Sequence, residues 1–103
     1  MRHILEISSR ALPGREEDYD LWYRTIHVRE VLALPGFESV ERYRRLGPSG
    51  AADGEFVALY TVETDDPPAL LQSLFDATPA MQLTDAIDPQ SPRFEFLLPL
   101  AEG

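Results

Sequence analysis

Residues 55–63 constrain the fold more than any other part of the chain. Within them, Phe-Val-Ala-Leu-Tyr-Thr-Val is apolar at almost every position, which is typical of a buried β-strand. A strand covered on one face alternates apolar and polar residues. Both faces of this strand are apolar, so we expect helices against one face of its sheet and a second surface against the other.

The segments before this strand predict two further strands and a helix. Residues 3–9 are predicted as a strand, and residues 15–34 carry a helical period with acidic residues near the start, where the helix dipole favours them. Pro35-Gly36 ends that helix. Residues 37–45 are predicted as the second strand and residues 46–54 as a long, flexible hairpin loop.

The last part of the chain predicts a second helix and a final strand. Asp65-Asp66-Pro67 is typical of a helix start, with an Asp cap and a proline in the first turn. That helix continues through Phe75, and Thr78-Pro79 is predicted to begin a further short helix that ends at about Ile87. Arg93 to Leu98 is predicted as the last strand, and Phe94-Glu95-Phe96-Leu97-Leu98 is apolar at most positions.

The resulting order, β-α-β-β-α-β, predicts an α+β ferredoxin-like fold. This fold has an antiparallel four-stranded sheet with two helices on one face. A chain of 103 residues suffices for one domain, which we expect to span residues 1–103. A second copy of the chain is the simplest cover for the other sheet face. The alternative is an open face with scattered apolar residues.

Charge and composition limit the partners and the compartment. The net charge of −9 argues against a nucleic-acid backbone or an anionic membrane surface as partner. No apolar stretch approaches the roughly 20 residues that span a bilayer, and residues 1–14 lack a signal-peptide core. The absence of cysteine excludes disulfides, thiolate metal sites and a cysteine nucleophile. We therefore expect a soluble, cytoplasmic protein.

One stripe of the first helix carries the candidate catalytic residues Tyr23, His27 and Glu30. A histidine there can act as a general base or acid, because its ordinary pKa is near neutral. Glu30 can orient the ring or act as an acid, and Tyr23 can donate a hydrogen bond to a developing oxyanion. The structural alternative is a histidine bonded to a backbone carbonyl or to Glu30, with Glu30 paired to an arginine at the rim of a pocket.

Five other aromatic residues are candidate ligand contacts on the same reasoning. Tyr60 and Tyr43 lie on strands that we expect beside the pocket, and the hydroxyl of a buried Tyr60 needs a partner. Phe75 and Met81 are expected to wall the pocket or to pack in the core. The candidates for substrate binding are Trp22, Tyr43, Phe56, Tyr60 and Phe96. Trp22 has packing in the core as its alternative, Phe56 and Phe96 are expected as apolar lining of the pocket, and the partner of the Tyr60 hydroxyl is a ligand, a backbone carbonyl or water.

No cofactor or metal is expected. His-x-His and His-Glu-x-x-His spacings are absent, and so are glycine-rich nucleotide loops and the Gly-x-Ser-x-Gly turn of a hydrolase. A metal on His27 and Glu30, or a haem on His27, is a lesser alternative. Arg42 and Arg44 share one face of the second strand, where they balance acidic neighbours or bind an anionic group of a substrate.

The first helix and its flanks resemble a known superfamily. Pro13-Gly14-Arg15-Glu16-Glu17 leads into Trp22-Tyr23, then His27 with Glu30, then Pro35-Gly36-Phe37. This pattern resembles the EthD-like branch of the dimeric α/β-barrel superfamily over about half of the chain. Members often have proline two residues after the histidine, where this chain has Arg29. The resemblance implies a homodimer whose two sheets form a barrel, with a pocket between sheet and helices in each protomer.

Three hypotheses for function follow. The first is a small cofactor-independent enzyme in which His27 moves a proton on a hydrophobic, aromatic or polyketide-like molecule, in a cyclase, isomerase, lyase or oxygenase step. The second is a non-catalytic protein that binds a small molecule in the same pocket. The third is an accessory dimer with a closed pocket and no activity of its own.

Overall fold

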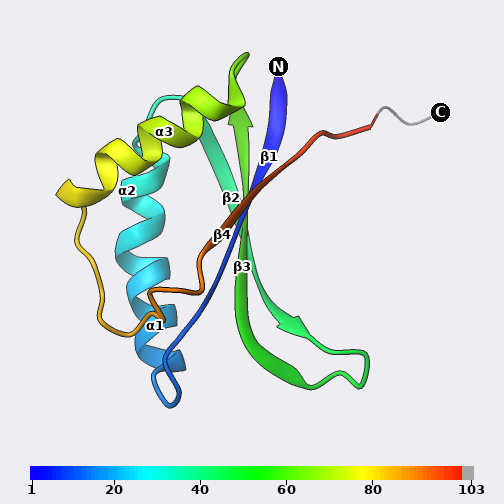
Figure 1. Cartoon of the computed structure of the whole chain (residues 1–103), viewed down its shortest axis with the longest axis vertical. Helices are drawn as coiled ribbons and strands as arrows, with labels where there is room; N and C mark the ends of the chain where they lie inside the picture. Colours follow the sequence, from blue (N-terminus) through cyan, green and yellow to red (C-terminus); the bar gives the residue numbers. More distant parts are fainter. Residues whose placement is uncertain (101–103) are drawn as a thin grey trace.

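Residues 1–100 are described by the computed structural model, and they form a four-stranded antiparallel sheet with helices against one face (Figure 1). The strands lie in the order β2-β3-β1-β4, which confirms the predicted ferredoxin-like fold. The elements are β1 (Arg2–Arg10), α1 (Glu16–Trp22), the π-helical turn η1 (Tyr23–His27), α2 (Val28–Leu32), β2 (Phe37–Leu46), β3 (Ala52–Glu63), α3 (Pro67–Ala77), the 3-10 turn η2 (Thr78–Ala80) and β4 (Arg93–Leu97).

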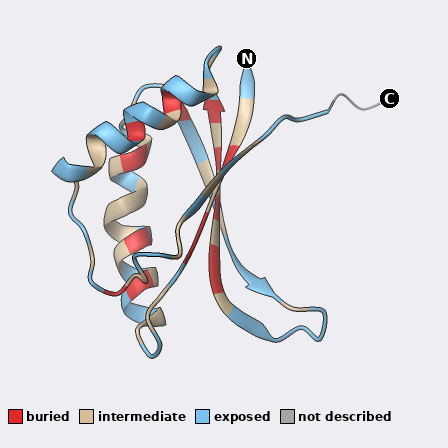
Figure 2. Ribbon diagram, in the orientation of Figure 1, coloured by how far each residue is buried: buried red, intermediate tan, exposed pale blue. Residues whose placement is uncertain are grey.

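Strand β3 divides its side chains between the two sheet faces as the sequence predicts. Phe56, Ala58, Tyr60 and Val62 are buried against the helices, and the residues between them lie on the outer face. Figure 2 shows the buried residues concentrated where the helices meet the sheet. The outer face carries Val57 and Leu59 from β3 with Ile4 and Leu97 from the neighbouring strands, so it is partly apolar.

The hairpin loop is shorter than predicted. Strand β3 begins at Ala52, so the loop covers 47–51 and the two strands are paired as far as Leu46 and Ala52. Figure 1 shows the end of this hairpin bending away from the helical layer.

The link between α2 and β2 depends on Gly36. Its φ of +89° is unfavourable for a residue with a side chain. An added Cβ would lie 2.9 Å from Leu70 Cδ1 and 3.0 Å from the carbonyl oxygen of Glu63. The predicted start of α3 is confirmed, because the Asp66 carboxylate accepts a hydrogen bond from the backbone N–H of Ala69 at 3.1 Å.

The prediction of a short helix from Thr78 to about Ile87 is wrong. Only Thr78–Ala80 is helical, and residues 81–92, which we call the strap, run without a regular helix from η2 to β4. Gln82 accounts for part of this difference. Its carbonyl accepts from Trp22 Nε1 at 2.8 Å and its N–H donates to the Glu30 carboxylate at 3.2 Å, so both backbone groups are satisfied outside a helix.

Candidate active site

A cavity of about 340 Å³ lies between the helical layer and the sheet edge formed by β1 and β4. This volume is at the small end of the range of roughly 300–1,000 Å³ found for ligand pockets. The cavity is mostly apolar, and its polar atoms come from a few residues. It is lined by Ile7, Ser9, Trp22, Tyr23, His27, Leu74, Phe75, Thr78, Leu83, Thr84, Ile87, Pro89, Pro92 and Phe94.

The π-helical turn η1 sets the geometry of the aromatic residues in the cavity. The N–H of Val28 bonds to the carbonyl of Tyr23, five residues earlier, which defines a π turn. Residues five apart are therefore stacked. The ring centroids of Trp22 and His27 lie 4.5 Å apart with an interplanar angle of 21°. Isolated π turns inside α-helices are frequent at functional sites.

His27 has an unusual environment for a histidine. Its Nδ1 is buried and has no hydrogen-bond partner within residues 1–100. Burial lowers the pKa of His27, Glu30 opposes this shift by its negative charge, and Arg42 adds to it by its positive charge. The imidazole is therefore neutral at pH 7, which is the form that can accept a proton.

Two pairs of hydroxyl groups each include one residue of the cavity lining, Tyr23 in the first and Ser9 in the second. The hydroxyls of Tyr23 and Tyr60 are 2.9 Å apart, and the hydroxyl of Tyr19 bonds to Ser9 Oγ. Burial raises the pKa of Tyr23 well above its ordinary value and raises the pKa of Tyr60 to about 12. Both phenols are therefore protonated at neutral pH and can donate hydrogen bonds.

Arg42 lies beside these tyrosines and not in the cavity lining. Its guanidinium carbon is 4.3 Å from the ring centroid of Tyr23, a cation–π distance, and its Nη1 is 2.8 Å from the Asp20 carboxylate. The expectation that Arg42 binds an anionic group of a substrate is not supported, because Asp20 already pairs with it.

Glu30 contacts the strap. Both of its carboxylate oxygens lie 3.2 Å from the N–H of Gln82, and no hydrogen bond joins Glu30 to His27 in the part of the chain that the structure describes. The carboxylate acts on the imidazole only through its charge. Glu30 and Trp22 together fix Gln82 next to the cavity.

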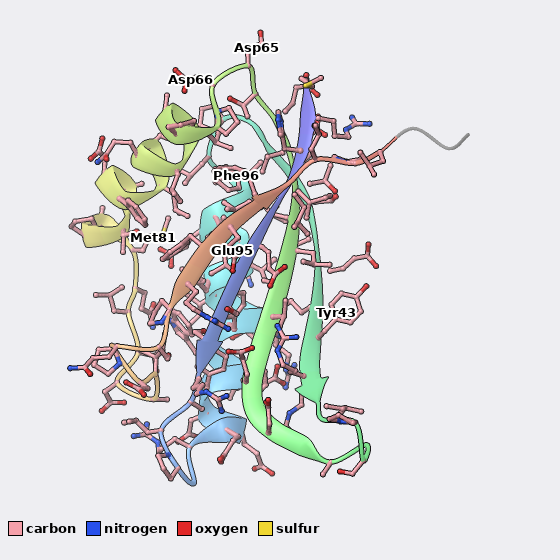
Figure 3. The ribbon with its side chains drawn as sticks, turned by 45° about the vertical axis from the view of Figure 1, so that its right-hand side comes forward. Tyr43, Asp65, Asp66, Met81, Glu95 and Phe96 are labelled. Carbon is pink, nitrogen blue, oxygen red and sulfur yellow. The ribbon has the colours of Figure 1, made fainter. Side chains whose placement is uncertain are left out.

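The other sequence-predicted contacts lie at different distances from the cavity. Tyr60 and Phe56 face the helices but are outside the cavity lining, with Phe56 packed on Tyr19 at 4.7 Å between ring centroids. Phe96, on β4 (Figure 3), pairs with Leu5 and also faces the helices. Its ring centroid is 6.3 Å from that of His3. These three side chains pack in or against the core, so the prediction that they contact a ligand in the pocket is not supported.

The predicted placement of Tyr43 beside the pocket is wrong. Tyr43 pairs with Val57 and therefore lies on the outer sheet face, opposite the helices. It is 49% exposed, and its hydroxyl donates to Glu41 at 2.9 Å. Figure 3 shows its side chain on the side of β2 away from the helices. The error arises because strand membership alone does not fix the face.

Several lining residues were not predicted. Ile7 and Phe94 lie opposite each other on β1 and β4, and Ser9 lies on the same face of β1, opposite Phe56 of β3. The strap contributes Leu83, which is 62% exposed. No motif or periodicity around Leu83 predicts that it lines a cavity. Phe75 and Met81 were each expected either to wall the pocket or to pack in the core. Phe75 lines the cavity, whereas Met81 is outside the lining and packs against the core.

The chemistry available to the cavity is limited by its side chains. The chain contains no lysine, which excludes a lysine Schiff base. Among residues 1–100, no carboxylate or guanidinium group lines the cavity. Within residues 1–100, no group of three or more histidine, aspartate or glutamate side chains is placed to hold a metal ion. No helix in this range is sufficiently long and apolar to cross a membrane.

Comparisons with known proteins give similarity at the level of fold. No protein-family model matches the chain, and no curated protein matches it in sequence. Two crystal structures share its architecture. An EthD family protein from Bacillus halodurans has 17% identity and a TM-score of 0.61, with 95% of this chain and 99% of that chain covered.

The second structure is a putative antibiotic biosynthesis monooxygenase from Bordetella bronchiseptica. It has 18% identity and a TM-score of 0.65, with 98% of this chain and 100% of that chain covered. At these identities the likeness establishes the fold and leaves the activity open. An EthD family protein among the structural neighbours supports the resemblance seen in the sequence between Pro13 and Phe37.

Proposed function

We propose that the protein is a small cofactor-independent enzyme that moves a proton on a hydrophobic, aromatic or polyketide-like molecule. The observation that carries this proposal is His27, a neutral histidine with a buried, unpartnered Nδ1 in the wall of an apolar cavity. Leaving a buried polar nitrogen unpaired costs free energy, so such a group needs a reason to persist. Because Nδ1 itself is buried, a ligand in the cavity meets the other atoms of the His27 ring, which line the cavity.

The proposed step is abstraction of a proton from carbon beside a carbonyl or from a phenol. An imidazole nitrogen of His27 takes the proton, and the electron pair of the broken bond moves onto the ligand oxygen. The hydroxyl of Tyr23 donates a hydrogen bond to that oxygen, and the imidazolium then returns the proton to carbon or oxygen. No oxidant or reductant is consumed, so cyclisation and isomerisation both follow from this step.

Glu30 has a supporting role in this proposal. Its charge opposes the fall in the pKa of His27, and its bond to Gln82 holds the strap against the cavity. Trp22 provides an aromatic surface in the cavity and stacks on the imidazole. We propose no direct contact between ligand and Phe56, Tyr60 or Phe96.

We further propose that the enzyme is a cytoplasmic homodimer. The outer sheet face presents Ile4, Val57, Leu59 and Leu97, which a second copy would bury around a twofold axis. The cavity lies on the opposite side of the sheet, so each protomer has its own site.

The alternative function is binding without chemistry. A thermal-shift screen of wild type and His27→Phe against phenols, quinones, aromatic ketones, short acids and haem tests the site. We expect a neutral aromatic class to raise the Tm of wild type by mass action and to act less on the variant. Equal responses of both proteins to every class would contradict a site at His27, and an unchanged ligand after prolonged incubation would favour the binding alternative.

A further inference from the structure

A second, more open hollow adjoins the cavity. This groove, of about 450 Å³, lies between the helical segment formed by α1 and η1 and the strap. Trp22, Leu83 and Thr84 line both hollows, so these three residues form the wall between them. Figure 1 shows the strap running beside the first helices on its way from α3 to β4. The groove is therefore continuous with the cavity wherever this wall opens.

The groove gathers exposed apolar side chains. Leu21 is 50% exposed and Leu83 is 62% exposed, and both line the groove together with Ile26. Large apolar side chains that are exposed in one hollow, and not scattered singly over a surface, are typical of a binding site. Since the groove shares its wall with the cavity, this arrangement favours an apolar part of the ligand in the cavity as the group that covers them.

The wall between the two hollows is weakly held. The backbone is fixed on either side of it, at Gln82 by the two contacts described above and at Ala86, whose carbonyl accepts from the N–H of Leu12 at 2.7 Å. Between these points, no backbone N–H or carbonyl of residues 83–85 has a hydrogen-bond partner within residues 1–100. A short segment without backbone hydrogen bonds opens at a low cost in free energy.

The charge of the groove is negative. Arg15 pairs with Asp18 on α1 and with Asp85 on the strap, at nitrogen–oxygen distances of 2.8 and 2.9 Å. Both aspartates line the groove, and one guanidinium balances only one of the two carboxylates. An anionic group would be repelled there, and burying it would also remove its hydration. The part of a ligand that suits the groove is therefore uncharged and apolar.

We propose that the groove is a second subsite, which takes an uncharged alkyl chain of a ligand whose ring lies in the cavity. The chain lies along Leu21 and Ile26, and residues 83–85 move aside to let it pass out of the cavity. This inference rests on the proposed function, since it extends the ligand of the same site. Leu21 and Ile26 then determine which chain lengths bind, without any part in proton transfer.

A series of phenols with unbranched alkyl chains tests the subsite. Trp22 is the one tryptophan of the chain and lines both hollows, so its fluorescence reports binding in either. The probes are 4-ethyl-, 4-butyl-, 4-hexyl- and 4-octylphenol, with 8-(4-hydroxyphenyl)octanoate as the charged comparison. We expect the affinity to rise roughly two- to fourfold with each added methylene as far as the octyl chain, as for burial of apolar surface. The octanoate is expected to bind about tenfold more weakly than 4-octylphenol, or worse.

Variants in the groove separate binding of the chain from binding of the ring. Leu21→Asp adds a third carboxylate to the groove, and we expect it to weaken binding of 4-octylphenol about tenfold and to leave binding of 4-ethylphenol unchanged. Leu46→Asp is the matched control, because Leu46 is an exposed leucine at the end of β2 and outside both hollows. It is expected to keep the wild-type affinities. Circular dichroism and the Tm of each variant establish that it is folded.

The outcomes separate this inference from the proposed function. An affinity that stops rising at the butyl chain, or a Leu21→Asp variant that affects 4-ethylphenol and 4-octylphenol equally, would overturn the subsite and leave the cavity as a binding site. Binding of the octanoate as tight as that of 4-octylphenol would overturn the claim of an uncharged chain. Failure of all five probes to change Trp22 fluorescence or the Tm of wild type would contradict the proposed function, and the inference with it.

Discussion

The imidazole of His27 stacks on the indole of Trp22, five residues earlier, with ring centroids 4.5 Å apart. In an α-helix, residues five apart lie on different faces, whereas the π turn at Tyr23–His27 brings them together. The same turn leaves Tyr23 in edge-on contact with His27, at 4.9 Å between ring centroids. The local backbone therefore assembles three aromatic rings on one side of the helix, next to the cavity.

The environment of His27 predicts a pH dependence of stability. Burial lowers its pKa in the folded state below the unfolded value of about 6.5. Between these two pKa values the unfolded chain binds more protons, so the free energy of unfolding rises with pH across this window and gains nothing further above it. Urea denaturation from acidic to neutral pH measures the slope, and His27→Phe is expected to reduce it. An unchanged slope in the variant would contradict the assignment.

The pKa itself is measurable by nuclear magnetic resonance. The chain has two histidines, so His3→Gln assigns the remaining imidazole signal to His27. We expect this signal to titrate below pH 6.5. Titration at or above that value would show that burial does not dominate its surroundings.

The hydroxyl pair of Tyr23 and Tyr60 predicts non-additive effects on stability. Tyr60→Phe leaves the buried Tyr23 hydroxyl without its partner, and we expect a loss of about 1–2 kcal/mol. The double variant Tyr23→Phe with Tyr60→Phe removes both polar groups and is expected to lose less than the sum of the single variants. Urea denaturation of the four proteins gives the coupling. Additive losses would contradict an energetically coupled pair.

The contact of Glu30 with Gln82 predicts a local opening of the strap. In Glu30→Ala, the N–H of Gln82 loses its acceptor, and we expect a loss of about 1 kcal/mol and faster hydrogen exchange in the strap. The pKa of His27 is expected to fall further, because the charge of Glu30 raises it. Glu17→Ala, at an exposed position of α1, is the control. Unaltered exchange in the strap of Glu30→Ala would contradict this role.

The outer sheet face predicts the oligomeric state. Leu59 lies on this face between Glu6 and Glu41 in the strand register, so an arginine there has acidic neighbours within one protomer. We expect Leu59→Arg to convert a dimer into a folded monomer, because the monomer leaves the arginine in water beside these acidic residues, whereas the dimer interface would remove its charge from water at a cost in free energy. Light scattering after gel filtration measures the mass. Leu21→Arg, on the helical layer, is the control, and a wild type that is monomeric would contradict the proposal.

Much of the fold could be predicted from local patterns. The apolar run of β3, the capping of α3 by Asp66 and the Pro35-Gly36 stop each depend on a few neighbouring residues with defined backbone preferences. The strand order then follows from the number and sequence of elements. The irregular conformation of the strap could not be predicted, because Gln82 is held by hydrogen bonds to Trp22 and Glu30, which are distant in the sequence.

The candidate site could be predicted only in part. The helical period correctly brought Tyr23 and His27 together, and it missed the stacking of Trp22 because a π turn breaks that period. The face on which Tyr43 lies depends on the pairing register with Val57, and one residue of shift reverses it. Ser9 lies on the helix-facing side of β1, where it pairs with Phe56, and no single-strand pattern reveals that pairing.

The central claim is that His27 moves a proton on a ligand in the cavity. Exchange of the hydrogens beside the carbonyl of tetralone with deuterated water, followed by proton magnetic resonance, measures this step without an identified substrate. We expect wild type to accelerate exchange by about 10²–10⁴ over buffer, with a rate that rises with pH through the lowered pKa of His27, and His27→Phe to return it to the buffer rate. Exchange by wild type no faster than buffer while tetralone is bound, or equal rates in wild type and His27→Phe, would contradict it.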